Sequence, residues 1–474
     1  MWQRKLAFAA ALAVCGGAQA ATDADLAANL GELRAQIEAM KKSYEQRIAA
    51  LEAKLATAEA AQPVAQPAPA PVAAPLPPAA SPGGGATAFN PEISVILDGK
   101  YASTSRNPNT YRLRGFLPNG GDIAPPKRSF SLGESELALA ANVDHLFRGT
   151  ALFAVDPDGG ISAEEAYMET LALPSGLKLK AGRFLSGIGY LNAQHPHAWD
   201  FADAPLVYKA FYGSRLDNDG VQLRWLAPTP VFLEFGAEMA RGAGFPGNER
   251  NRNGNGLGTL FVHVGDDVGI SHSWQAGLSY VGTRPNGRQF EDIEAAGNVN
   301  AAGSFAGTSH TVGADLVWKW APNGDPTYRN FKFQAEYMQR RENGSLAYDD
   351  TASAAIPAGA GLVGNATDGY RRRQSGWYAQ GVWQFMRGWR VGYRHDALDS
   401  GSASLGPALA LADAAGLQRY NPRRDSLMVD WSPSEFSRVR LQFARDDSRG
   451  PGLEDNQFFV QYIMSLGAHG AHKF

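Results

Sequence analysis

From residue 90 to the end of the chain, apolar and polar residues alternate one by one in many short segments. For example, Val439, Leu441 and Phe443 are separated by Arg440 and Gln442. Successive side chains of a strand point to opposite faces, so this period indicates strands that are apolar on one face only. The pattern predicts an all-β fold of about sixteen strands, within a range of roughly 14–18. They are expected near 93–105, 129–143, 149–156, 161–173, 177–184, 215–227, 231–241, 258–266, 272–283, 309–321, 331–342, 375–386, 389–398, 424–432, 437–446 and 456–474.

The connections between these strands alternate between short and long. Tight turns such as 174–176 and 387–388 follow the even-numbered strands, and Trp residues stand near several strand ends. Tight turns on one rim, long loops on the other and aromatic strand ends are typical of a transmembrane antiparallel β-barrel. We therefore predict such a barrel over 90–474. Its long loops are expected at 106–128, 185–214, 242–257, 284–308, 343–374 and 399–423.

The last predicted strand carries the most specific local signal. Phe458, Tyr462 and Phe474 fall on one face of it, and Phe474 ends the chain. Such a strand resembles the insertion signal by which barrel-assembly machinery recognises outer-membrane proteins of Gram-negative bacteria. Residues 90–474 resemble a sixteen-stranded porin, in general pattern the phosphate-selective porin O and P family. This resemblance implies an outer-membrane location, contact with outer-membrane lipid and a homotrimer.

The first twenty residues read as a signal peptide. A basic start is followed by an apolar run and by Ala18-Gln19-Ala20, which fits the small-residue rule for cleavage. The alternative is a lipoprotein signal ending at Cys15, the single cysteine of the chain. With one cysteine, disulfides and cysteine-built zinc sites are excluded.

Two further segments are expected before the barrel. In 21–61, apolar residues recur at steps of three and four, which predicts a short α-helical coiled coil that self-associates, similar to that of sugar-specific porins. The alternative is a lone amphipathic helix lying on another surface. The Pro/Ala/Gly-rich stretch 62–89 reads as a linker. The coiled coil would then be periplasmic, with possible cell-wall contact.

Charge and motifs narrow the class of function. The 44 Lys and Arg nearly balance the 47 Asp and Glu, so no basic surface points to nucleic acid. A Gly-x-Ser-x-Gly elbow, a His-Glu-x-x-His helix and a phosphate loop are all missing from the sequence. We predict that the protein is not an enzyme and has no cofactor.

The loop 185–214 is the best candidate for narrowing the barrel. It is aromatic and apolar for a solvent-exposed loop, which favours burial inside the lumen. Imidazoles and a carboxylate are possible metal ligands. Yet a lone His-x-His in a loop usually makes hydrogen bonds, so no metal is predicted and His195 and His197, beside Asp200, are only weak candidates. The residues assigned to this constriction loop are His195, His197, Asp200, Asp203 and Lys209.

The polar faces of the strands supply the candidate pore lining. Lumenal charges set which ions enter a narrow pore, and here cations outnumber anions, which predicts a mild anion preference. The alternative is that these charges pair across the wall and stiffen the barrel. The assigned residues are Lys178, Lys180, Arg224, Lys319, Lys332, Arg340, Arg390, Arg394, Arg438, Arg440, Glu134, Glu136 and Asp315.

Three functions are consistent with this organisation. The first is a porin for passive diffusion of small hydrophilic solutes through a pore narrowed by the inward loop. The second is an outer-membrane anchor whose coiled coil tethers a periplasmic or cell-wall partner. The third is uptake of a metal or metal chelate, which normally needs a folded plug domain before the barrel.

Overall fold

The computed structural model describes residues 91–118, 123–157, 159–249, 251–293, 299–353, 363–411 and 417–467. The predicted signal peptide (1–20), coiled coil (21–61) and linker (62–89), and Phe474, lie outside the described residues. The chain divides into the units Met1–Gly83 and Gly84–Phe474, and the description below concerns the second unit alone.

Nineteen strand segments form one sheet. Pairing is antiparallel throughout, and β1 pairs both with β3 and with the last strand, β19, so the sheet closes on itself. The segments are β1 (Glu92–Thr104), β2 (Ser129–Leu132), β3 (Ser135–Asn142), β4 (Phe147–Val155), β5 (Ile161–Thr170), β6 (Leu177–Leu185), β7 (Asp217–Leu226), β8 (Phe232–Ala240), β9 (Leu257–Val268), β10 (His272–Thr283), β11 (Asn286–Ile293), β12 (Val299–Trp320), β13 (Asn330–Asp349), β14 (Asn365–Met386), β15 (Trp389–Asp399), β16 (Ala403–Leu405), β17 (Arg423–Ser434), β18 (Ser437–Asp446) and β19 (Asp455–Gly467).

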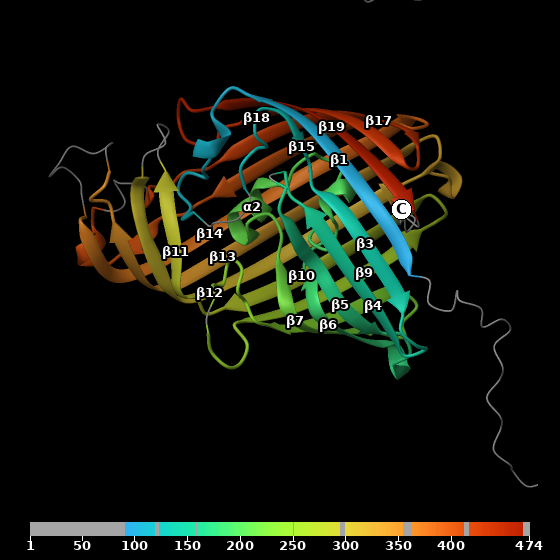
Figure 1. Cartoon of the computed structure of the whole chain (residues 1–474), viewed down its shortest axis with the longest axis horizontal. Coiled ribbons are helices and arrows are strands. Elements are labelled where there is room, and N and C mark those ends of the chain that lie inside the picture. Colours follow the sequence, from blue (N-terminus) through green and yellow to red (C-terminus); the bar gives the residue numbers. More distant parts are fainter. Residues whose placement is uncertain are drawn as a thin grey trace, which may run out of the picture. The chain divides into compact units, whose positions relative to one another are not determined.

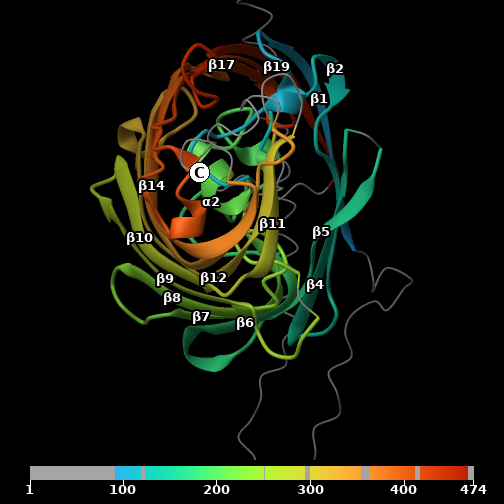
Figure 2. The ribbon, with the colours of Figure 1, turned by 90° about the vertical axis from the view of Figure 1, so that its left-hand side faces the viewer.

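The closed wall has sixteen strand positions. β2 and β3 both pair with β1 and share one position, while β11 and β16 are short strands that pair with the outer ends of β12 and β14. Figures 1 and 2 show the resulting barrel, with the helix α2 (Leu206–Tyr212) inside the ring of strands. The prediction of a sixteen-stranded antiparallel barrel is confirmed.

The two faces of the wall differ in polarity. Leu427 and Leu441 point outward and are 52% and 46% exposed, whereas their neighbours Ser426 and Gln442 point inward and are buried. The same alternation runs through the other strands, so large apolar residues cover the outer face. Such a surface is suited to lipid. No helix among the described residues is long and apolar enough to cross a membrane.

Four of the predicted segments are wrong in part. The predicted loop 399–423 contains the short strand β16. The stretches 284–308 and 343–374, predicted as loops, are partly strand, because β12, β13 and β14 extend beyond the apolar belt as long hairpins. There the outer faces are polar, and the inner faces pack residues such as Leu346 and Tyr370 against loop residues. The apolar-outside pattern therefore disappears, although the backbone pairing of β13 with β14 continues to Asp349↔Asn365. The predicted strand 129–143 is divided at 133–134 into β2 and β3.

The interior contains its own apolar core. Phe116, Ile188, Leu206 and Phe211 come from two long connections and are almost fully buried against wall residues such as Tyr378. Single-turn 3-10 helices shape these connections and several turns. They span Pro108–Thr110, Pro174–Gly176, Pro196–Ala198, Pro322–Gly324 and Pro407–Leu409.

Candidate functional site: the inward loop and the barrel interior

The second of the predicted long loops, which in the structure spans residues 186–216, lies within the barrel and is called the inward loop. Its two ends are joined at the wall, because Ser186 N–H donates to the Leu216 carbonyl and the Asn192 amide bridges both residues. Pro205 precedes α2, and Gly213 ends the helix with a φ of 66°. All seven residues of α2 are buried. Burial of this aromatic, apolar segment holds the loop inside instead of on the outer surface.

Two loop aspartates tie the inward loop to one side of the wall. Asp203 lies 2.6 Å from Arg424 and 2.9 Å from Arg394, while Asp200 lies 3.0 Å from Arg390 and also pairs with Lys332. Burial alone would raise the pKa of each aspartate, but the surrounding cations outweigh it and hold both pKa values well below their usual range.

Lys209 lies within the same group of charges. Its ammonium is 3.5 Å from Asp203, and its side chain is 3% exposed. Burial lowers the pKa of Lys209, with Asp203 acting in the opposite direction. The lysine thus contributes to holding the loop and faces the protein interior.

Neutral and acidic wall groups bind the rest of the loop. Glu336 of β13 accepts hydrogen bonds from Tyr208, Tyr378 and the Leu191 N–H at 2.7, 2.6 and 3.0 Å. Glu238 of β8 accepts from the loop's first residues. The loop is therefore fixed to several sides of the barrel.

The predicted histidines lie against the opposite wall, in an acidic cluster. His195 is 3.4 Å from both Glu164 and Glu165 of β5, and Glu136 of β3 accepts a hydrogen bond from Nδ1 of His197 at 2.9 Å. Burial disfavours a charged imidazole, but the facing carboxylates of Glu164, Glu165 and Glu136 outweigh it and raise the pKa of His195 to about 10.

Asp200 does not join these histidines, which corrects the grouping expected from the sequence. Its carboxylate is held by Arg390 and Lys332 on the other side of the barrel. The sequence analysis missed Glu164 and Glu165 as partners of His195. The two adjacent carboxylates interrupt the apolar–polar alternation of the predicted strand. The interruption coincides with the register shift in the pairing of β4 with β5.

The candidate pore-lining residues point to the inner side of the wall, but many are paired and buried. Arg340 donates to Gln374, Arg440 donates to the Trp199 carbonyl, and Arg215 bridges Glu134 and Glu164. Lys178 and Arg224 remain partly open to solvent, with side chains 45% and 30% exposed. Among the arginines of β15–β18, Arg390, Arg394 and Arg424 form ion pairs with aspartates.

Asp315 and Lys180 occupy different surroundings. Asp315 is buried beside Gly277, and Lys180 stands 4.1 Å from the centre of the Tyr167 ring. Arg438 lies on the inner face of β18, 3.4 Å from the Trp199 carbonyl. These residues contact the wall or the loop.

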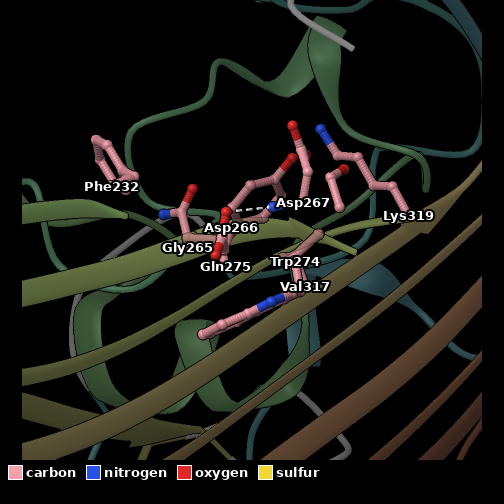
Figure 3. Close-up of a pocket in the computed structure, with 10 residues that line it drawn as sticks. Phe232, Gly265, Asp266, Asp267, Trp274, Gln275, Val317 and Lys319 are labelled. Carbon is pink, nitrogen blue, oxygen red and sulfur yellow. Dashed lines mark hydrogen bonds between the residues drawn. The ribbon is translucent and has the colours of Figure 1, made fainter. Parts of the chain in front are cut away.

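A cavity opens inside the rim of tight turns (Figure 3). It has a volume of about 340 Å³ and is lined by residues of β8, β9, β10 and β12 together with Tyr190 of the inward loop. Asp267 and Lys319 flank Ser273 in register, on the same side of the strands. The ammonium groups of Lys319 and Lys332 lie 6.0 and 5.9 Å from the centre of the Tyr190 ring. The cavity therefore combines apolar and polar lining and bears charges of both signs.

Several residues that hold the loop were not among the predicted site residues. Arg424 of β17 and Asp396 of β15 are fully buried, and Asp396 accepts from the Leu206 N–H at the start of α2. Their inward direction follows from the same alternation that places Asp430 inside. The sequence pattern therefore showed that these side chains point inward. It did not show which loop residues they contact, because those contacts depend on how the loop folds.

A closed antiparallel wall with an apolar outer face, a polar inner face and a loop packed inside it defines a transmembrane β-barrel protein. No family model matches the sequence. The chain is 33% identical over 417 residues to an uncharacterized protein of Aquifex aeolicus (strain VF5), across 82% of this chain and 80% of that protein. The chain therefore belongs to the same family as this Aquifex aeolicus protein.

Solved structures with a similar barrel are outer-membrane proteins and channels. OmpT of Vibrio cholerae (in-vitro folded) has a TM-score of 0.47 at 10% identity, covering 79% of this chain and 97% of that one. OprB of Pseudomonas putida has a TM-score of 0.45 at 13% identity, covering 80% and 94%. The channel DcaP of Acinetobacter baumannii has a TM-score of 0.46 at 11% identity, covering 80% and 96%. At these identities the similarity concerns the barrel fold alone.

Proposed function

We propose that the protein is an outer-membrane porin through which small hydrophilic solutes diffuse passively. The observation that carries this proposal is the sixteen-position closed wall, apolar outside and polar inside. A barrel of this strand number is wide enough to hold water unless something narrows it. The inward loop supplies the narrowing, because it is anchored to opposite sides of the wall through Asp203 and His195.

A mild anion preference belongs to the same proposal. The arginines of β15–β18 are largely neutralised by aspartates, so the preference rests on cations nearer the rim of tight turns. Lys178 and Arg224 are partly exposed there, although Lys178 pairs with Glu169 at 2.7 Å and Arg224 with Glu234 at 3.6 Å. Charges in a narrow, partly desolvated lumen act on ions more strongly than in bulk water. The excess of cations would then be small, and so would the selectivity.

Solute diffusion can be tested by swelling of liposomes that contain the purified protein. Liposomes loaded with an impermeant polymer are diluted into isotonic solutions of sugars of increasing size. We expect swelling whose rate falls as the solute grows, because the inward loop limits the passage. Liposomes that swell no faster than protein-free liposomes, with the barrel correctly folded, would contradict the proposal.

The amino-terminal assignments extend the proposal beyond the described residues. We propose a signal peptide over 1–20, a periplasmic coiled coil over 21–61 and a linker over 62–89, followed by the barrel. The coiled coil and the barrel together would hold a homotrimer, and Phe474 with Tyr462 would guide insertion. We also propose kinship with the phosphate-selective porin O and P family. Deletion of residues 21–88 separates a porin from a tether: a porin still conducts, whereas a tether loses its function.

A further inference from the structure

The cluster of carboxylates and histidines at the inward loop is the strongest unassigned site. Glu136 of β3, Glu164 of β5 and His195 of the loop place one potential ligand atom each within 4.8 Å of one another. The Glu136 side chain is 1% exposed. Carboxylate oxygens and imidazole nitrogens are ligands that divalent transition metals bind in proteins.

Two ligand atoms in this cluster are buried without a hydrogen-bond partner. They are Nδ1 of His195 and Oε2 of Glu164, which face each other at 3.4 Å. Their separation is longer than the usual range of about 2.7–3.2 Å for an N–H···O hydrogen bond, so the ion pair satisfies the two atoms only in part. A bound ion between them would satisfy both atoms more fully.

The distances suit a shared metal ion. Ligand atoms at about 2.0–2.1 Å from a tetrahedral Zn²⁺ lie roughly 3.3–3.4 Å from each other. His195 Nδ1 lies 3.4 Å from Glu164 Oε2 and 3.8 Å from Glu136 Oε2. Small side-chain rotations would bring all three atoms into a single coordination sphere.

The neighbouring groups support the same ligands. His197 Nδ1 is 2.9 Å from the other oxygen of Glu136, an arrangement that orients the carboxylate, as outer-shell partners do in metal sites. The four carboxylates of Glu134, Glu136, Glu164 and Glu165 outnumber the two neighbouring side-chain cations, Arg215 and Lys180. A dication would offset this negative charge.

We propose that Glu136, Glu164 and His195 bind one divalent transition-metal ion, of the Zn²⁺ or Co²⁺ kind, which clamps the inward loop to strands β3 and β5. The imidazole ligand and the small ligand number favour such an ion over Ca²⁺, which takes six to eight oxygens. The clamp would act on the side of the loop opposite the Asp203 ion pairs. Binding does not depend on whether the barrel conducts.

The test is metal titration of the full-length protein in detergent, after treatment with a chelator. Calorimetry with Zn²⁺ and visible absorption with Co²⁺ measure stoichiometry, affinity and imidazole ligation. We expect one ion per chain and little competition by excess Ca²⁺. Since metal binding stabilises the folded state, Zn²⁺ should also raise the unfolding temperature.

Variants locate the ion. His195→Gln and Glu164→Gln should each weaken Zn²⁺ binding and abolish the Co²⁺ spectrum, and His197→Gln should weaken binding by about 10–100-fold, as loss of an outer-shell partner does. The matched control is His469→Gln/His472→Gln, which removes the other closely spaced histidine pair of the chain and should leave binding unchanged. Circular dichroism shows whether each variant is folded.

Three results would overturn the proposal. The first is no binding of Zn²⁺ or Co²⁺ to the folded wild-type protein. The second is unchanged binding in folded His195→Gln and Glu164→Gln variants. The third is loss of binding in the His469→Gln/His472→Gln control alone. Each of these is separate from the liposome result, since the titration measures no solute flow.

Discussion

Oδ2 of Asp203, on the inward loop, lies 2.6 Å from Nη2 of Arg424, on strand β17. The same aspartate contacts Arg394 at 2.9 Å and Lys209 at 3.5 Å, and accepts a hydrogen bond from Gln442 at 3.0 Å. One loop carboxylate thus joins cations from two strands and from the loop itself. This contact is one of those that tie the loop to the wall.

Replacement of Asp203 by Asn should loosen the inward loop. Arg394, Arg424 and Lys209 would lose a common counter-charge, and removing one partner of a buried ion pair costs about 3–5 kcal/mol. Urea unfolding followed by tryptophan fluorescence should show a lower free energy of unfolding. The control is Asp219→Asn, which breaks an exterior pair with Arg183 whose side chains are more than 40% exposed and should cost about 0–1 kcal/mol. Equal stability of Asp203→Asn and wild type would argue against the anchor.

Acid should weaken the same contacts. The pKa values of Asp200 and Asp203 are held below their usual range, so their ion pairs stabilise the folded state fully above the unfolded-state pKa of about 3.9. That stabilisation is lost as pH falls through the lower folded-state values. Between pH 7 and 5 these two groups should change the free energy of unfolding little, and below about pH 4 they should reduce it. Urea titrations at pH 7, 5 and 3 test this, and Asp203→Asn should show a smaller acid loss than wild type.

A charge on the outer face should hinder membrane insertion. Leu441 points outward from β18 and is 46% exposed, so Leu441→Arg would place a guanidinium in lipid. At the middle of a bilayer such a change costs about 2–4 kcal/mol in a membrane barrel. Folding into lipid vesicles, scored by heat-modifiable migration, should fall in yield. Glu435→Arg, in an exposed turn, adds the same side chain outside the belt and should fold normally. Full insertion of the Leu441→Arg variant would contradict the assignment of Leu441 to the lipid-facing apolar surface.

Removal of two partly exposed cations should reduce the anion preference. In Lys178→Gln/Arg224→Gln, Glu169 loses Lys178 and Glu234 loses Arg224, so the lumen becomes more negative. The reversal potential in a salt gradient should therefore shift toward cation permeation. Arg183→Gln changes an exterior arginine and should leave the reversal potential unchanged. A double variant with wild-type selectivity would assign the preference to other residues.

The sequence determined the wall more fully than the site. The bounds predicted for 272–283 and 437–446 agree with β10 and β18, because a one-residue slip would turn apolar side chains inward. The position of the inward loop inside the barrel also followed from its apolar content. The partners of that loop did not follow, because Asp203 meets Arg394 across 191 residues of chain. Such contacts depend on how an irregular loop folds, and a loop lacks the regular alternation of apolar and polar residues that predicts strands.

The most direct test of the account is current through planar lipid bilayers containing the purified full-length protein. A closed, polar-lined wall narrowed by a tethered loop predicts discrete conductance steps, with larger steps in Asp203→Asn because its loop is less firmly held. Folded, inserted protein that gives no stepwise current at any voltage would contradict the account.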